Sequence, residues 1–539
     1  MVEGLQMLAK HINANDKALI VVDADADGFC SAAIFMNYFN KFFPWWVQNN
    51  VNYFIHTGKQ HGLKDVLEQS NWLAKGYKLI IVPDAASNDY EAHELLHNHQ
   101  VDCLVLDHHE ADGGYSKYAC VINNQLSTQY PTKSLCGGAV VYKFCSQFDI
   151  LMKTNYAKDF EDLVALSLIS DMMDQRDFET HELIKLGLAN ITNHFFVEMM
   201  NRQRYQFENN ITPIGIAFYI TPYINAMVRS GTPEEKYLMF EAMLDWRSDE
   251  LIPSTKRGCK GQVETRHEQA GRTCINVKSR QKKAQDSSLA YVEELIYENN
   301  LLENKLLVVC VAADAVDQNL AGLIANQIAN KYAKPTLILR ETVDEEGIPV
   351  YAGSGRNYGN SQLEDFRQFC LDTGLTSLAQ GHASAFGCVI PVENYDKFVE
   401  VTNEKLKDFD FSPCYLVDLE LNFDQLDDND VFSIGSNADL WGQHLDEPLI
   451  AITNIRLTAD TIHFIGSNKN TLKISFPDRR LNIIKFNVTE EEKQLLDPQN
   501  GIIIITAIGK CALNHYMGNV TPQIMLEDFE IQTRSQWEF

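Results

Sequence analysis

The sequence lacks the features that mark membrane, secreted and disulfide-bonded proteins. None of its apolar runs is long enough to span a bilayer, and Met1–Gly4 begins neither a basic nor an apolar signal segment. Its 12 cysteines are scattered without a Cys-x-x-Cys pair, which argues against a zinc or disulfide framework and is typical of reduced thiols. It has no internal repeat and no low-complexity segment. We therefore expect a cytoplasmic protein without membrane contact.

Positive charge is also scarce. The chain carries 46 Lys and Arg against 73 Asp and Glu, a formal net charge of −27. This balance argues against non-specific nucleic-acid affinity over the whole surface, since phosphate binding needs local cationic surface. Residues 256–283 are the basic exception, and they form either a solvated linker or helix face or a surface that tracks a nucleic-acid strand. The basic residues of this segment are Lys256, Arg257, Lys260, Arg266, Arg272, Lys278, Arg280, Lys282 and Lys283.

Length and pattern indicate a multidomain globular protein. A chain of 539 residues is too long for one core. Residues 17–190 alternate short apolar runs with helical patterns, which is typical of βαβ units, and a second α/β unit starts near residue 305. After about residue 410, closely spaced short strands indicate a β-barrel or sandwich. The predicted boundaries are 1–232 for the first α/β lobe, 233–300 for a helical basic linker, 301–408 for the second α/β lobe and 409–539 for an all-β domain.

Three apolar runs of the first lobe stop abruptly at metal-ligand side chains. Ala18–Val22 runs into Asp23-Ala24-Asp25-Ala26-Asp27-Gly28, Leu79–Pro83 ends at Asp84, and Leu104–Leu106 ends at Asp107-His108-His109. The carboxyl ends of parallel strands meet at one edge of a sheet, so we expect these side chains to lie close together. Residues 162–170 predict a buried apolar helix that ends at Asp171. Because a buried carboxylate is costly unless it is paired or binds a metal, we expect Asp171 to join the same site.

These residue types predict a divalent metal site. Paired carboxylates such as Asp25 and Asp27 repel each other unless a cation lies between them, and Gly28 allows a tight turn around a ligand. Each cluster alone is also compatible with an ordinary helix cap or turn, and Asp23 either binds metal or orients a neighbour. Together they favour Mn²⁺ or Mg²⁺, with two ions about 3.5–4 Å apart that activate a water and clamp a phosphate. The chemistry predicted is that of a metal-dependent phosphoesterase.

The clusters, in this order, resemble the DHH phosphoesterase superfamily, named for the triplet that is Asp107-His108-His109 in this sequence. Further segments narrow the resemblance to RecJ-like single-strand exonucleases and extend it over nearly the whole chain. The resemblance implies an α/β fold of two lobes, a DHH domain and a DHH-associated domain, joined by a helical linker and followed by an OB-fold. The segments are Val121–Gln125, Tyr130-Pro131, Leu135–Phe144, Pro222–Ala226 with Arg229, Gly353–Arg356, Gly381–Gly387, Leu472–Ile474 and Asn514.

The family implies roles for individual residues. His109 would lie beside the scissile phosphate, with Asp107 and Asp23 as further catalytic residues. The implied ligands of Mn²⁺ or Mg²⁺ are Asp25, Asp27, Asp84, His108 and Asp171. The implied phosphate-binding residues are Arg229, Ser354, Arg356, Gly381 and His382; a guanidinium suits bidentate phosphate binding, and a glycine leaves the backbone open to an anion.

Three positions depart from the family pattern. Gln318–Ala321 lacks a histidine that usually precedes the glycine matching Gly322, Gln380-Gly381 replaces a pair of glycines, and Met227-Val228-Arg229 lacks a small Ala-Gly pair. These departures leave the implied metal ligands unchanged. They leave open how the protein contacts the nucleotide and in which direction it cleaves.

The resemblance implies an exonuclease that hydrolyses terminal phosphodiesters of single-stranded DNA with metal-activated water, 5′→3′ if it follows RecJ. RNA stays open as a substrate, and single-strand-binding or replication and repair proteins are candidate partners. One alternative is an oligoribonuclease or cyclic-dinucleotide phosphodiesterase of the superfamily, but such enzymes usually lack an OB-fold. Another is a non-catalytic replication or DNA-binding scaffold, which the filled ligand positions disfavour.

Overall fold

The computed structural model describes residues 1–536 except 59, 112, 208–209, 345–346, 360, 413, 499–500 and 517. The chain divides into two compact units, one made of residues 1–277 with 417–539 and the other of residues 278–416. In the part of the chain so described, no helix is both long and apolar enough to cross a membrane.

A parallel sheet forms the centre of the first lobe, with strand order β2-β1-β3-β4-β5. Every residue of β1 and β3 is buried, as expected for strands that helices cover on both faces. The three apolar runs predicted as strands are confirmed. The strand bounds are Ala18–Val22 for β1, Val51–Ile55 for β2, Leu79–Pro83 for β3, Asp102–Asp107 for β4 and Cys120–Asn123 for β5.

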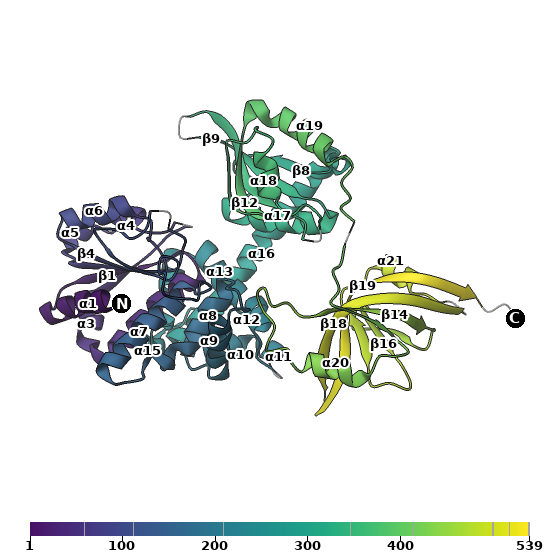
Figure 1. The fold of residues 1–539 in the computed structure, drawn as a ribbon, viewed down its shortest axis with the longest axis horizontal. Coiled ribbons are helices and arrows are strands. Elements are labelled where there is room, and N and C mark those ends of the chain that lie inside the picture. Colours follow the sequence, from purple (N-terminus) through teal and green to yellow (C-terminus); the bar gives the residue numbers. More distant parts are fainter. Residues whose placement is uncertain are drawn as a thin grey trace. The chain divides into compact units, whose positions relative to one another are not determined.

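Alternate residues of these strands enter two separate cores. Ile20 and Leu104 pack with α1, α2, α3, α7 and α8 on one face, while Val21 and Val105 pack with α4, α5 and α6 on the other. Figure 1 shows the two groups of helices on opposite faces of the sheet. The bounds are α1 Val2–Ala14, α2 Ala26–Phe42, α3 Pro44–Asn50, α4 Lys64–Gln69, α5 Trp72–Lys75, α6 Tyr90–Asn98, α7 Gly137–Met152, η1 Ala157–Phe160 and α8 Glu161–Ser170.

A helical region follows and continues the core of the first lobe. Met239, Phe240 and Cys274 lie in that core, so much of the segment predicted as a linker packs against the lobe. The last helix of the region, α16, crosses into the second unit. The elements are α9 Phe178–Ala189, α10 His194–Arg202, α11 Arg204–Phe207, α12 Pro213–Tyr219, α13 Thr221–Ser230, α14 Pro233–Ala242, α15 Asp245–Ser248, β6 Leu251–Pro253, β7 Val263–Thr265 and α16 Arg266–Glu298.

Part of the basic segment 256–283 is neutralised by acidic neighbours. Arg266 pairs with Glu241 and Glu250, and Glu264 accepts from both Arg272 and Lys256. These cations hold the hairpin β6–β7 and the start of α16 to the lobe. The exposed lysines further along, Lys282 and Lys283, keep the alternative of a strand-tracking surface open.

The second unit is built on a mixed sheet of order β11-β12-β10-β9-β8. Strands β8 and β9 are parallel, and the other pairs are antiparallel. Helices α16 and α17 contribute to the core on one face, while α18 and α19 pack on the other. The bounds are η2 Leu301–Glu303, β8 Leu307–Val311, α17 Gln318–Tyr332, β9 Thr336–Val343, β10 Pro349–Arg356, α18 Phe366–Leu371, β11 Leu378–His382, β12 Ala385–Pro391, η3 Val392–Asn394 and α19 Tyr395–Leu406.

The C-terminal region is a mostly antiparallel sheet of order β13-β14-β18-β19-β17-β16-β15. Buried and part-buried residues alternate along most of β18, so one face of this long strand covers an apolar core. The short strands predicted after residue 410 thus include a much longer one, β18. The bounds are β13 Leu419–Asn422, α20 Asp428–Gly435, β14 Leu449–Leu457, β15 Ile462–Ile465, β16 Thr471–Ser475, β17 Asn482–Lys485, α21 Glu490–Leu495, β18 Gly501–Tyr516 and β19 Asn519–Gln536.

The contact between α8 and α9 depends on Gly187. A Cβ at this residue of α9 would lie 2.1 Å from the Glu161 carbonyl oxygen and 2.6 Å from the Ala165 Cβ, both on α8. We expect Gly187→Val to lower the free energy of unfolding by about 1–3 kcal/mol, because the two helices must separate. Urea unfolding followed by tryptophan fluorescence measures this change.

The matched control is Gly359→Val, since a Cβ at Gly359 would meet nothing within 4 Å. Equal unfolding midpoints for the two variants would contradict the close α8–α9 contact.

Candidate metal centre

The turn from β1 into α2 supplies three carboxylates. Asp23 follows the strand and is fully buried, Asp25 caps α2 by accepting from the Gly28 N–H at 2.9 Å, and Asp27 lies in the first turn of the helix. A Cβ on Gly28 would lie 2.6 Å from that of Asp23. Glycine at this position therefore lets the helix start directly against the acidic turn.

Asp27 is held by the N-terminus of α7. Its two oxygens accept from the backbone N–H groups of Gly137 at 2.7 Å and Gly138 at 2.9 Å, and the Ser167 hydroxyl donates as well. Burial acts to raise the pKa of Asp27, but His108 and these hydrogen bonds outweigh it, so the pKa is lowered. Asp27 is thus kept charged and fixed in direction.

The same glycines are places where a side chain would not fit. A Cβ on Gly137 would lie 2.4 Å from Asp84 Oδ1, and one on Gly138 would lie 2.2 Å from Ser167 Oγ. The two glycines let the helix N-terminus approach the carboxylates directly. The sequence motifs gave neither glycine a role; the signal was a Gly-Gly pair at the start of an apolar helix.

The predicted ligands converge around His108. Its Nε2 lies 3.2 Å from Asp84 Oδ1, 3.4 Å from Asp171 Oδ2 and 3.8 Å from Asp27 Oδ2. Asp84 ends β3 and Asp171 caps the C-terminus of α8, as the sequence predicted. Asp25 joins this group through Asp84, since donor atoms of Asp23, Asp25 and Asp84 lie within 4.8 Å of one another. One edge of the sheet therefore gathers all five predicted metal ligands.

Several of these buried polar atoms have no hydrogen-bond partner among the described residues. They include both carboxylate oxygens of Asp84, Nε2 of His108 and Oδ2 of Asp171. Burial, followed by repulsion from Asp27 and Asp25, raises the pKa of Asp84 well above its usual range and that of Asp171 to about 8. A buried acid without partners is costly, and a divalent cation bound by oxygen and imidazole donors removes that cost. The residues fit Mn²⁺ or Mg²⁺.

Asp23 faces two histidines that the sequence motifs did not single out. Its Oδ2 lies 2.5 Å from His61 Nδ1, and its Oδ1 lies 4.0 Å from Nε2 of the buried His56. The hydrogen bond to Asp23 raises the pKa of His61. The only sequence signal was a pair of histidines in the glycine-containing segment after β2. Asp23 is placed both to orient His61 and to join Asp25 and Asp84 at the metal centre.

Donor atoms of Asp84, Asp107, His108 and His109 lie within 4.8 Å of one another, but the hydrogen bonds of the Asp107 carboxylate hold His109. Its carboxylate accepts from the backbone N–H groups of Ser87 and His108 and from Nδ1 of His109 at 2.8 Å. This bond raises the pKa of His109 to about 9, and half of the His109 side chain is exposed. A cationic imidazole is therefore presented to solvent next to the buried predicted ligand His108.

The second unit brings together three of the predicted phosphate-binding residues. Ala385 of β12 pairs with Arg356 of β10 on one side and with His382 of β11 on the other, so Arg356 and His382 lie in one row across the sheet. Ser354 lies two residues from Arg356 along β10 and therefore on the same face. The Arg356 guanidinium lies over α17 where Gly322 has no side chain, since a Cβ there would be 2.5 Å from Nη2.

The other two predicted phosphate-binding residues have separate positions. Gly381 has a φ of 132°, and a Cβ on it would lie 2.8 Å from the Ala385 carbonyl oxygen, so this position requires glycine. Arg229 belongs to the first unit, where it is exposed in the last turn of α13.

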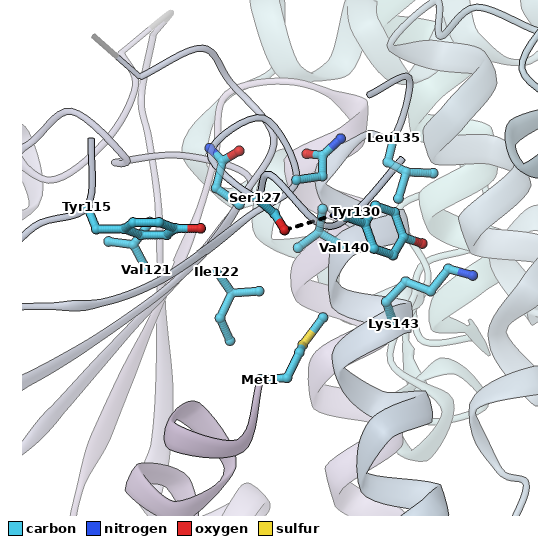
Figure 2. A pocket seen from close by; sticks show the side chains of 11 residues that line it. Met1, Tyr115, Val121, Ile122, Ser127, Tyr130, Leu135, Val140 and Lys143 are labelled. Atoms are coloured by element: carbon cyan, nitrogen blue, oxygen red, sulfur yellow. Dashed lines mark hydrogen bonds between the residues drawn. The ribbon is translucent and has the colours of Figure 1, made fainter. Parts of the chain in front are cut away.

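A cavity of about 190 Å³ lies between β5 and α7 (Figure 2). Val121, Ile122 and Val140 form apolar parts of its wall, and the lining residue Ser127 accepts from the Tyr130 N–H at 3.2 Å. Asn123 links the cavity to the triplet by donating to the His109 carbonyl oxygen. Its described lining contains none of the predicted ligands, so this cavity is separate from the metal centre.

Known proteins share the order of domains seen in this chain. The family model described as "DHH family, N-terminal domain" matches residues 17–168, and that of the RecJ OB domain matches residues 417–528. A protein of Bacillus subtilis (strain 168), named as an SPbeta prophage-derived single-strand DNA-specific exonuclease, YorK, is 34% identical over 534 residues, which cover 98% of this chain and 90% of that protein. The single-stranded-DNA-specific exonuclease RecJ of the same organism is 21% identical over 561 residues, covering 100% of this chain and 65% of RecJ.

Solved structures show the same fold. RecJ from Thermus thermophilus in complex with Mn²⁺ matches with a TM-score of 0.71 at 16% identity, covering 98% of this chain and 71% of that chain. RecJ from the same organism in complex with Mg²⁺ matches with a TM-score of 0.66 at 15% identity, covering 99% of this chain and 70% of that chain.

The pairing of Asp107 with His109 predicts a pH dependence. Because the pKa of His109 is raised to about 9, the imidazole keeps its proton below that pH and loses it above. If catalysis uses the cation, Asp107→Asn should move the alkaline fall in activity toward the ordinary histidine value of about 6.5. A profile of kcat/KM against pH at saturating Mg²⁺ measures the shift.

Glu110→Gln is the matched control, since Glu110 is an exposed acid beside His109. An unchanged alkaline limb in Asp107→Asn would contradict a role for the His109 cation.

Proposed function

Since this chain belongs to the DHH family, in the group that joins a DHH domain to a RecJ OB domain, we propose that it is a metal-dependent exonuclease of single-stranded DNA. The resemblance drawn from the sequence motifs is confirmed, and so is the fold class of α/β lobes with a C-terminal OB-fold. Relatives named as single-strand DNA-specific exonucleases support the substrate. The finer proposals concern the metal number, the residue roles and the direction of cleavage.

One observation supports the chemistry above all others: a buried set of acids and an imidazole in which both oxygens of Asp84, Nε2 of His108 and Oδ2 of Asp171 have no hydrogen-bond partner among the described residues. Asp27, His108 and Asp171 form one set of donor atoms, and Asp23, Asp25 and Asp84 form a second. We propose that these sets would hold two divalent ions. Asp84 lies 3.2 Å from His108 and so adjoins both sets. Bound there, the ions would supply Lewis acidity toward a phosphate and lower the pKa of a water molecule.

His109 is proposed to act on the substrate through Nε2. Its Nδ1 is committed to Asp107, so Nε2 carries the proton that can reach a phosphate oxygen or the leaving oxygen. The fixed carboxylate of Asp107 holds both the orientation and the charge of this ring. Asp107 is thus a positioning residue in this proposal.

The strand is proposed to be held by cationic and polar groups outside the metal centre. Ser354, Arg356 and His382 share one face of the second unit, where a guanidinium and two further donors can bind backbone phosphates. Gly381 and Arg229 are proposed as further phosphate contacts. The RecJ OB domain is proposed to bind the single strand away from the cut, and cleavage is proposed to run 5′→3′.

A time course with Mn²⁺ on strands labelled at either end tests this function. Single-stranded DNA, single-stranded RNA, duplex DNA and a dinucleotide are compared. The proposal expects immediate release of a 5′-labelled mononucleotide from single-stranded DNA, with the duplex spared. Immediate release from the 3′ end would overturn the polarity, cleavage confined to RNA or the dinucleotide would overturn the substrate, and no cleavage would favour a scaffold.

Asp27→Asn should lower cleavage by roughly 100-fold or more, because it removes the charge that the α7 N-terminus holds toward His108. Binding of single-stranded DNA, measured by fluorescence anisotropy, should change little. Asp174→Asn, at an acid paired with Arg176 on the surface, is the control. Retained cleavage in Asp27→Asn would contradict the assignment of the first acidic turn.

The exposed end of the basic segment gives a further prediction. Lys282→Glu/Lys283→Glu should weaken binding of long single strands more than of dinucleotides. It should also flatten the dependence of log K on log salt by about 1.4, the value for two lost phosphate contacts. The control is Lys75→Glu/Lys78→Glu, which reverses two exposed lysines at and just after the end of α5. Equal losses on both lengths would contradict a strand-tracking role.

A further inference from the structure

A second cluster of metal-binding side chains lies on the first unit, built from residues that no motif singled out. His194 is the first residue of α10, Asp249 follows α15, and His267 is the second residue of α16. Half of the His194 side chain and more than half of that of Asp249 are exposed, while His267 is mostly covered. The cluster is open to ions from solvent.

The two imidazoles share one carboxylate oxygen. Nδ1 of His194 lies 2.8 Å from Asp249 Oδ1, and Nδ1 of His267 lies 3.4 Å from the same atom. The ring centroids are 5.6 Å apart. Ligands about 2.0–2.1 Å from a tetrahedral Zn²⁺ are themselves about 3.3 Å apart. The three donor atoms lie within 4.8 Å of one another, so small shifts of these side chains would bring them to that spacing.

Neighbouring residues orient His267 and form no ion pair with Asp249 among the ion pairs described. His267 Nε2 lies 3.2 Å from the Thr265 hydroxyl, a contact of the kind that fixes a ligating ring. Its Nδ1 also lies 3.1 Å from the Ser248 carbonyl oxygen, a contact that metal binding would replace. The neighbouring cations Arg247 and Arg266 are paired with Glu241 and Glu250. Asp249 is therefore shared by the two histidines alone among the ion pairs described.

The donor set differs in kind from that of the catalytic centre. Two imidazoles with one carboxylate suit Zn²⁺ and similar transition metals, whereas a set dominated by carboxylates suits Mn²⁺ and Mg²⁺. A tetrahedral ion held by three side chains keeps a fourth position for water. We propose that His194, Asp249 and His267 bind Zn²⁺ and thereby fasten the start of α16 to α10.

Because of the position of the cluster, a bound ion would hold the start of α16 in place. Helix α16 begins at Arg266, beside His267, and continues beyond the first unit. An ion that joins α10, the α15 end and α16 would fix the base of this helix in the same way that a metal cross-link closes a loop. The proposal is independent of the nuclease reaction.

The test counts Zn²⁺ bound by the full-length protein. Chelator-stripped protein is loaded with Zn²⁺ in excess Mg²⁺, desalted and analysed for metal by mass spectrometry. We expect Asp249→Asn and His194→Gln/His267→Gln to bind one Zn²⁺ fewer per chain, or to bind it at least tenfold more weakly in competition with a chelating dye. His515→Ala, at an exposed histidine elsewhere, and Asp84→Asn, at the catalytic centre, should keep this ion.

Activity and folding are measured on the same variants. Asp249→Asn, which nearly preserves the side-chain shape, should retain Mn²⁺-dependent cleavage and the circular dichroism spectrum of the parent. Zn²⁺ should raise the unfolding midpoint of the parent and of His515→Ala but not that of Asp249→Asn. Equal Zn²⁺ content in Asp249→Asn and the parent, or loss of all bound Zn²⁺ in Asp84→Asn alone, would overturn the proposal.

Discussion

The structure depends on one electrostatic constraint: acidic groups are gathered at a buried edge of a parallel sheet with too few internal partners. Asp84 and His108 are buried, Asp171 lies against them, and their facing atoms make no hydrogen bond among the described residues. Burial and mutual repulsion raise the pKa of Asp84 well above its usual range, so the folded chain by itself disfavours the charged form. A divalent cation reverses this preference. The same crowding that suits the site to a cation is therefore expected to destabilise the folded chain when no metal is bound.

The fold maintains this arrangement by close backbone approach. Gly28, Gly137 and Gly138 stand where a Cβ would meet Asp23, Asp84 or Ser167 at less than 3 Å. The N-terminus of α7 stabilises the negative charge of Asp27 through two backbone N–H groups, so this acid stays charged while its neighbour Asp84 is driven toward protonation. His109 is controlled separately, through Asp107. The proposed metal ligand His108 and the proposed proton donor His109 thus lie side by side at the end of β4.

Much of the first lobe and of its metal site was predictable from the sequence. Several apolar runs of this lobe end in acidic residues, and such repetition indicates that the acids share a site. The strands at 18–22 and 79–83, the helix that ends before Asp171 and the meeting of Asp27, Asp84 and His108 follow from strand order in a parallel sheet. The contacts of His61 with Asp23 and the approach of Gly138 to Asp27 were not predictable, since they depend on how a loop and a helix end pack across the sheet edge. Likewise, the ion pairs of Arg266 join residues whose proximity exists only in the folded lobe.

The most direct measurement is the thermal unfolding of chelator-treated protein and of its Asp84→Asn variant, each with and without Mn²⁺. If acid crowding is the central constraint, Asp84→Asn unfolds at a higher temperature than the parent without metal, because it removes a buried acid whose oxygens lack hydrogen-bond partners among the described residues. Mn²⁺ then raises the midpoint of the parent far more than that of the variant. Equal midpoints without metal and equal gains with Mn²⁺ would contradict the account.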